Sequence, residues 1–375
     1  MRRGRGPRAL AARERAGAAD PVRGRERAPV DRRMTEALGE ASGKVILLGE
    51  HAVVYGAPAL AAGIERGARA RATRCSGASA LLLGGRELRA APAEEDVARA
   101  FAALLGALPD VGPVRVEAES DLPPGGGLGS SAALAVAIAR SVAALARAPA
   151  ASARTASEGA AAAHTAADAA AVTDAAAAWE RVFHGNPSGI DTTAAARGGC
   201  FRFTRAHGAT SVAPRDDLWL CVGSTGVSSS TRSMVELVAR LFERKPTLAA
   251  TSIAGITALV ENAAFAIEAG DAVALGRLMD LNQMLLAGMF VSTEAIEALC
   301  KLAREAGALG AKLTGAGGGG SVIALLPPPP PGNRGAAASN GAADRVLAAW
   351  RDAGYSGFVT RVRAGMTRTE SQEQA

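Results

Sequence analysis

The sequence predicts a protein of about two domains in which helices pack closely on β-sheets. At 375 residues the chain exceeds the usual size of one domain and can bury substantial cores. Hydrophobic residues make up 49% of the chain but aromatic residues only 3%, so the cores must consist mainly of alanine, leucine and valine. A second domain is predicted to start near Pro214.

The positive charge of the chain is confined to its first 33 residues. These contain 11 arginines and four acidic residues, a net charge of +7, whereas the whole chain has +6 and the remainder therefore −1. Because the charge is not spread along the fold, it argues against a nucleic-acid-binding protein. The segment also lacks the serines of a transit peptide and the apolar core of a secretory signal. It is expected to be disordered, or to precede a true start at Met34.

Cysteine spacing and hydropathy favour a soluble, cytoplasmic protein. The four cysteines lie far apart and form no C-x-x-C pair: Cys75, Cys200, Cys221 and Cys300. They are expected to be buried free thiols in a reducing compartment rather than zinc ligands or disulfides. No apolar run approaches the length of a membrane span, so no membrane partner is expected.

The first predicted strand is short and is flanked by charged residues. It extends from Gly43 to Gly49, where the sequence reads GKVILLG. Lys44 lies at its start, and Glu50 and His51 follow it directly. Each charge beside a core strand needs a partner. The three side chains could pair with one another, or they could line an active site at the end of the strand.

The next segments alternate between strands and helices. Residues 66–90 predict a meander with a tight hairpin at Gly84–Gly85. Residues 96–108 have helical spacing, and residues 113–119 alternate strictly, as expected of a half-exposed strand. Residues 131–145 are apolar nearly all round and predict a central, buried helix.

The stretch from Pro123 to Ala133 reads PPGGGLGSSAA and predicts an anion-binding loop. Its glycines free the backbone, so several N–H groups can turn toward one point. Ser130 and Ser131 open a helix, where unpaired amides and the helix dipole attract an anion. A phosphate is the expected ligand, although a flexible linker before a helix would have the same composition. No Gly-Lys-Ser/Thr follows, so the loop is not a P-loop.

An alanine-rich segment from residue 150 to residue 184 predicts a long helix by intrinsic propensity. Gly185 and Pro187 are expected to end it. The segment that follows is too irregular for a regular element. From the residues alone, Asp191 is expected to be the N-cap of another helical turn.

The second half of the chain predicts a series of helices and a second glycine-rich loop. A strand at 218–223 and a hydroxyl-rich loop at 225–231 lead into helices expected at 232–242, 250–269, 271–287, 294–307 and 342–353. Residues 312–326 read KLTGAGGGGSVIALL, a glycine-rich loop that feeds a strand, and residues 357–363 predict the last strand. A proline-rich stretch at 327–340 is predicted to be a disordered surface insertion.

Three separated motifs together resemble those of the GHMP small-molecule kinases. They are GKVILLGEHAVVYGAPALA at 43–61, PxxxGLGSSA at 123–132 and KLTGAGGGG at 312–320. Within that superfamily, GEHAVVYG at 49–56 and ERVFHGNPSGID at 180–191 are similar to the mevalonate kinase family. The resemblance covers roughly residues 42–365.

The resemblance implies an α+β fold with an N-terminal ATP-binding domain at 34–213 and a C-terminal ferredoxin-like domain at 214–370. The active site would lie in the cleft between them. The implied reaction transfers the γ-phosphate of ATP to the primary hydroxyl of mevalonate, giving 5-phosphomevalonate for isoprenoid synthesis. The alternatives are another kinase of the superfamily, acting on phosphomevalonate, a sugar or homoserine, and a catalytically silent ligand sensor. Dimerisation occurs in the family, but no stretch of this sequence demonstrates it.

The resemblance also implies roles for single residues. Asp191 would be the catalytic base beside Lys44, in place of an N-cap; whether it accepts the proton or orients the hydroxyl stays open. Mg²⁺ would be held by Ser131 and Glu180 together with phosphate oxygens. The ATP phosphates would lie on Pro123, Gly125, Gly126, Gly127, Leu128, Gly129, Ser130 and Ser131. Contacts with the substrate are expected from Lys44, Glu50, His51, Ser188, Asp191, Thr231 and Gly315. Glu50 and His51 would line the mevalonate site or hold Lys44 in place.

Overall fold

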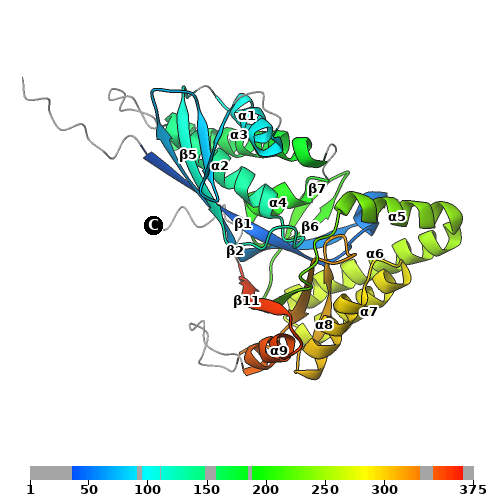
Figure 1. Ribbon diagram of the computed structural model, residues 1–375. Helices are drawn as coiled ribbons and strands as arrows, with labels where there is room; N and C mark the ends of the chain where they lie inside the picture. The colour runs from blue at the N-terminus through cyan, green and yellow to red at the C-terminus, as the bar shows by residue number, and fades with distance from the viewer. Residues whose placement is uncertain are drawn as a thin grey trace, which may run out of the picture. The chain divides into compact units, whose positions relative to one another are not determined.

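Two long antiparallel strands, β1 (Glu36–Leu48) and β2 (Ala59–Arg74), form the spine of the larger sheet in the computed structural model (Figure 1). The structure describes residues 36–90, 95–109, 111–147, 158–184, 188–329 and 341–365. The pairing of β1 with β2 shifts register between Ser42 and Gly43 and again between Ile46 and Leu48. Such bulges re-aim side chains, and here they lie on either side of Lys44.

Within the described residues, the larger sheet has seven strands in the order β4-β3-β5-β2-β6-β7, with β1 pairing to β2. The other strands are β3 (Ala80–Leu83), β4 (Arg86–Arg89), β5 (Val114–Ser120), β6 (Cys200–Thr204) and β7 (Gly208–Val212). Strand β3 runs parallel to β5, and the other pairs are antiparallel. The expected hairpin is confirmed, because Gly84 and Gly85 turn between β3 and β4 with φ of 57° and 78°.

Helices α1 (Asp96–Gly106), α2 (Ser130–Arg147), α3 (Glu158–His184) and α4 (Ile190–Arg197) cover one face of this sheet (Figure 1). Helix α2 is central and packs on β1, β2, β5, α3 and α4. Most of its buried residues are alanine, as composition predicts. The small residues permit close approach: a Cβ on Gly39 of β1 would lie 2.1 Å from the carbonyl oxygen of Ala137.

The second half of the chain builds a four-stranded antiparallel sheet in the order β11-β8-β10-β9. Its strands are β8 (Leu218–Ser224), β9 (Gly310–Thr314), β10 (Ser321–Leu325) and β11 (Ser356–Val362). The helices with it are α5 (Thr231–Arg244), α6 (Pro246–Ala269), α7 (Ala272–Gly288), α8 (Glu294–Glu305) and α9 (Gly341–Asp352). Helices α7 and α8 pack on β9, and α8 and α9 pack on each other.

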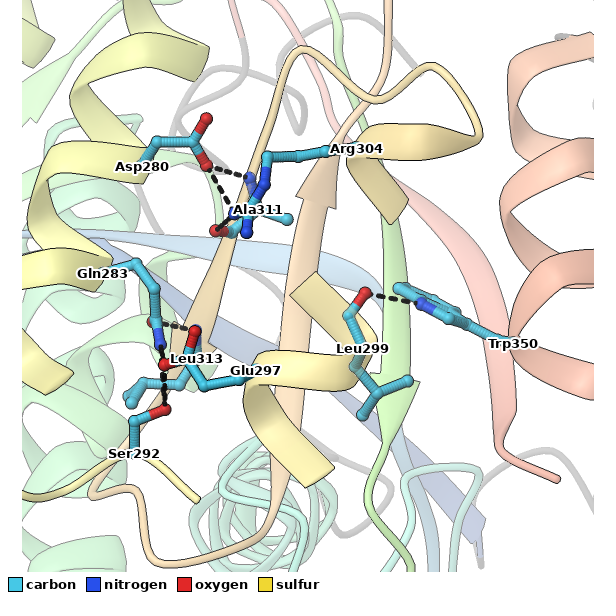
Figure 2. A network of polar contacts seen from close by, with 9 residues as sticks. All are labelled: Asp280, Gln283, Ser292, Glu297, Leu299, Arg304, Ala311, Leu313 and Trp350. Carbon is cyan, nitrogen blue, oxygen red and sulfur yellow. Dashed lines mark hydrogen bonds and ion pairs between the residues drawn. The ribbon is translucent and has the colours of Figure 1, made fainter. Parts of the chain in front are cut away.

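Side chains of α7 complete the hydrogen bonding of β9, the edge strand of this sheet (Figure 2). Asp280 Oδ1 accepts from the backbone N–H of Ala311 at 3.0 Å, and Gln283 Oε1 accepts from that of Leu313 at 2.9 Å. Arg304 of α8 donates to Asp280 at 3.0 Å. An edge strand otherwise leaves such groups unpaired, so these contacts fix the position of β9.

Several sequence expectations need correction. Strand β1 begins well before the predicted strand at 43–49, and the short strands β6 and β7 were not predicted. Cys200, Cys221 and Cys300 are buried free thiols as expected, and burial raises the pKa of each to about 12, but Cys75 is half-buried.

Two helices of the described part, α2 and α6, are long and apolar enough to cross a membrane, which corrects the expectation that no apolar run approaches that length. In α2, 61% of the apolar segment is buried inside the protein, and in α6 33%. A core helix meets the same criterion of length and composition, and α2 is the central helix of its sheet.

Some expectations fall outside the described residues. They concern the tail at 1–33 with the start at Met34, the helix end at Gly185 and Pro187, and most of the proline-rich insertion, from residue 330 to 340. The boundary near Pro214 lies between β7 and β8 and stays a prediction, since all described residues belong to one compact unit, Met34–Ala375.

Candidate functional site

Lys44 and Asp191 form an ion pair where β1 meets the start of α4. The Nζ of Lys44 lies 3.2 Å from Oδ1 of Asp191; the lysine side chain is 5% exposed and the aspartate side chain 39%. The N-cap of α4 is Gly189, with φ of 84°, and Asp191 is the second residue of the helix. The expectation of an Asp191 N-cap is therefore wrong, and its carboxylate faces a buried cation instead.

The first glycine-rich loop lies against Lys44. The backbone N–H of Lys44 donates to the carbonyl of Leu128 at 2.9 Å. Gly129 has φ of 73°, and a Cβ there would lie 2.9 Å from Cγ of Lys44, so a side chain is excluded on both grounds. The loop ends at Ser130, the first residue of α2, whose hydroxyl lies 3.3 Å from that of Ser120. The loop thus delivers a helix N-terminus, which suits an anion, to the Lys44 side chain.

Ser131 and Glu180 come together from α2 and α3, as the resemblance implies. Ser131 Oγ donates to Glu180 Oε1 at 2.5 Å and accepts from Trp179 Nε1 at 3.1 Å. The Glu180 side chain is buried. A hydroxyl and a carboxylate oxygen within hydrogen-bond distance are hard donors of the kind that Mg²⁺ prefers. No group of three or more histidine, cysteine, aspartate or glutamate residues in the described ranges is arranged to hold a metal.

The polar residues after β1 take partners from the second half of the chain. Glu50 Oε1 accepts from Nζ of Lys312 on β9, and both side chains are fully buried. His51, with φ of 60°, places Nε2 2.8 Å from the carbonyl oxygen of Ala316. Because Lys44 pairs with Asp191, the alternative that Lys44, Glu50 and His51 simply pair with one another is wrong.

Burial shifts the titration of these groups. Desolvation raises the pKa of Glu50 above its ordinary value, although the charge of Lys312 opposes this. Desolvation also lowers the pKa of Lys312, against the opposing effect of Glu50. The pKa of His51 is lowered by burial, with the Ala316 carbonyl acting in the opposite direction.

The second glycine-rich loop packs directly on the first. A Cβ on Gly127 would lie 3.2 Å from the carbonyl oxygen of Thr314, and one on Gly126 3.2 Å from Oγ of Ser321. Gly315 has φ of 94° and lies against Gly127. The hydroxyl of Thr314 also bonds the backbone of Ile46 on β1, accepting at 2.8 Å and donating at 3.2 Å. Close backbone approach therefore brings both loops and β1 to one place.

Two of the predicted substrate contacts, Ser188 and Thr231, have only local hydrogen bonds or an exposed position. Ser188 Oγ accepts from the backbone N–H of Ile190 at 3.4 Å, three residues before Asp191 in the chain. Thr231 is the exposed first residue of α5, and its neighbour Ser230 caps that helix. Lys312 was missed as a site residue, although its place at the start of the third motif could have indicated it.

Comparisons with known proteins agree with this geometry. The GHMP kinases N terminal domain model matches residues 95–199, and the GHMP kinases C terminal model matches residues 263–356. A mevalonate kinase of Aeropyrum pernix is 36% identical over 75% of this chain and 86% of its own length, and one of Thermococcus onnurineus is 33% identical over 75% and 86%. The structure of L. major mevalonate kinase in complex with R-mevalonate superposes with a TM-score of 0.70 at 28% identity, covering 88% of this chain and 96% of that one. The chain therefore belongs to the GHMP kinases, within the mevalonate kinase family.

Proposed function

We propose that this protein is an ATP-dependent mevalonate kinase that transfers the γ-phosphate of ATP to the primary hydroxyl of mevalonate, giving 5-phosphomevalonate. The observation that carries the proposal is the Lys44–Asp191 ion pair beside the first glycine-rich loop. Phosphoryl transfer requires mainly positioning and neutralisation of charge, and this arrangement offers a base, a cation and an anion-binding helix start together.

Asp191 and Lys44 have complementary roles in the proposed reaction. The carboxylate of Asp191 is exposed enough for an alcohol to reach it, and it accepts the hydroxyl proton as the new bond to phosphorus forms. Lys44 stays desolvated beside it, where a positive charge stabilises the developing alkoxide and the phosphate more strongly than in water.

The first loop and the Ser131–Glu180 pair would bind the nucleotide. The residues from Pro123 to Ser131 supply backbone N–H groups and the N-terminus of α2 for the phosphates of ATP. Ser131 and Glu180 would hold Mg²⁺, which when bound neutralises phosphate charge. Trp179 orients the Ser131 hydroxyl by donating to its oxygen.

The substrate contacts are a further part of the proposal. His51, Ser188, Thr231 and Gly315 are proposed to contact mevalonate together with Lys44 and Asp191. Glu50 is fully buried and its partner is Lys312 rather than Lys44, which argues against a direct contact of Glu50 with the substrate. We further propose that the enzyme is soluble and cytoplasmic, and that the N-terminal and C-terminal domains meet near Pro214.

The test is the acceptor profile of the full-length protein with Mg²⁺ and ATP. ADP release is measured with mevalonate, phosphomevalonate, galactose and homoserine at equal concentrations. The proposal predicts that kcat/KM is highest for mevalonate. Turnover of another acceptor above mevalonate would assign the protein to a different activity of the superfamily, and no turnover with any of them would favour a silent ligand sensor.

A further inference from the structure

Lys44 forms an ion pair with one carboxylate, and its charge also acts on a second, that of Glu50. Asp191 lies 3.2 Å from its Nζ. Glu50 follows the same strand, and the charge of Lys44 lies near enough to act on the pKa of both Glu50 and Lys312. Whether Lys44 stays with Asp191 therefore depends on whether Glu50 has another cation as its partner.

Glu50 cannot remain charged in its position without a cation. Its side chain is 1% exposed, and an ionised carboxylate in such surroundings is unfavourable unless it is paired and hydrogen-bonded. Lys312, with 0% exposure, donates to Oε1 of Glu50 and, at 2.5 Å, to the carbonyl of Leu313. The second oxygen, Oε2, receives no hydrogen bond from the described residues, so the pair depends on Lys312.

Lys312 is held where it is by the contacts of its own strand. The residues on either side of it, Ala311 and Leu313, are bonded to Asp280 and Gln283 of α7 through their backbone N–H groups (Figure 2). The charged or titratable groups that act on Lys312 are Glu50 and Lys44 from β1 and its end, and Cys300 from α8. The lysine thus lies on an edge strand that α7 holds in place, and its Nζ donates to one carboxylate.

We propose that Lys312 is a positioning residue that keeps Lys44 on Asp191 by occupying the competing carboxylate of Glu50. This inference rests on the proposed kinase function. Without Lys312, the buried Glu50 carboxylate is expected to attract Lys44, the other lysine whose charge acts on it, and Asp191 then loses its partner. Lys312 does not touch the substrate in this account and acts only through Glu50 and Lys44.

The first test is structural and does not depend on turnover. Crystal structures of the full-length Lys312→Met and Glu50→Gln/Lys312→Met variants are compared with that of the parent. In Lys312→Met, Nζ of Lys44 is expected within 4 Å of the Glu50 carboxylate and away from Asp191. In the double variant, which removes the competing charge, Lys44 is expected back on Asp191. A Lys44–Asp191 contact that persists in Lys312→Met overturns the inference.

The second test is kinetic, with the melting temperature of each variant showing that it is folded under assay conditions. Misplacement of Lys44 predicts a fall in kcat on the order of 10²-fold in Lys312→Met, with the KM for ATP little changed. Lys312→Arg, which keeps the charge, should retain more activity than Lys312→Met, and the double variant should recover most of the lost kcat. The control is Trp350→Phe, which removes the hydrogen bond from Trp350 Nε1 to the carbonyl oxygen of Leu299, outside β9, and should lower the melting temperature without lowering kcat.

The two proposals fail in different ways. If the parent enzyme phosphorylates mevalonate and folded Lys312→Met keeps its kcat, the inference about Lys312 is wrong and the proposed function stands. The same holds if the double variant is as slow as Lys312→Met, because the competing carboxylate is then not the cause. If the parent does not phosphorylate mevalonate, the proposed function fails, and the structural comparison alone decides the position of Lys44.

Discussion

The carboxylate of Asp191 is partly exposed and lies beside the buried ammonium group of Lys44, so its charge can be tested by a single substitution. The Asp191→Asn variant keeps the size of the side chain but removes its charge and most of its basicity. We expect kcat to fall by about 10²- to 10⁴-fold, the usual contribution of a positioned base, while ATP binds as before. Coupled ADP-release assays and calorimetric ATP titration measure the two effects.

The control for this variant is Asp96→Asn. Asp96 is an exposed residue in the first turn of α1, paired with Arg99, and lies in none of the proposed binding segments. The Asp96→Asn variant should leave kcat unchanged. An Asp191→Asn variant as fast as the parent would remove Asp191 from the mechanism.

His51 gives a prediction for the pH dependence of stability. Burial lowers its pKa in the folded protein, whereas the unfolded chain has the ordinary value of 6.5. Below that pH the unfolded state binds more protons, so the free energy of unfolding decreases as the pH falls, and this decrease levels off below the folded pKa. At pH 8 the histidine is neutral in both states, so its titration does not change the free energy of unfolding.

The His51→Asn variant tests this pH dependence, because asparagine tolerates the φ of 60° at this position. Urea unfolding of the parent and the variant is compared at about pH 5 and about pH 8. The parent is expected to lose more stability than the variant between these values. Equal losses in the two proteins would show that His51 does not contribute to the acid sensitivity.

At the scale of elements, the edge strand β9 depends on the side chains of α7. In Gln283→Leu the backbone N–H of Leu313 loses its acceptor while staying buried, which should cost about 1–3 kcal/mol of the free energy of unfolding. Asn262→Leu is the matched control, because Asn262 bonds within its own exposed helical turn of α6 and should change stability by less than about 0.5 kcal/mol. Chemical denaturation measures the free energy of unfolding of both variants. Equal losses would mean that the hydrogen bond from Leu313 to Gln283 does not stabilise the protein more than an exposed contact does.

The elements that the sequence predicts well are those whose pattern is local. Periodicity and caps place α2 and β5 within a few residues, and the glycine pair at 84–85 identifies its hairpin. Strands β6 and β7 are five residues long, too short to show a reliable alternation. The start of β1 escapes because Glu36 to Ser42 is small and polar and is ordered mainly by pairing with β2. Sheet order depends on contacts between distant segments, which no local pattern records.

At the scale of the whole molecule, the site is assembled from segments that are far apart in the chain. The three motifs were recognisable in the sequence, and the structure joins Lys44 to Asp191 and Ser131 to Glu180. Their partners were not predictable, since residue spacing does not reveal that Glu50 pairs with a lysine 262 positions later. The same holds for Thr314, which bonds the backbone of β1 from the second glycine-rich loop.

The two glycine-rich loops bring both halves of the chain together at the candidate site. The first loop presents the start of α2, and the second packs closely on it: a Cβ on Gly126 would lie 3.2 Å from Oγ of Ser321, and one on Gly127 3.2 Å from the carbonyl oxygen of Thr314. Lys312 and Ala316 from the second half then hold Glu50 and His51 of the first. We therefore expect the nucleotide and the alcohol to be positioned by both halves of the chain together.

The identity of the product tests this account most directly. Mevalonate carries a primary hydroxyl on C5 and a tertiary hydroxyl on C3, and the parent enzyme is incubated with it, ATP and Mg²⁺ before phosphorus NMR. The account predicts one new phosphomonoester for each ADP formed, with its phosphorus coupled to the two methylene protons of C5. A phosphoester without methylene coupling, or ADP formation with no phosphorylated mevalonate, would contradict it.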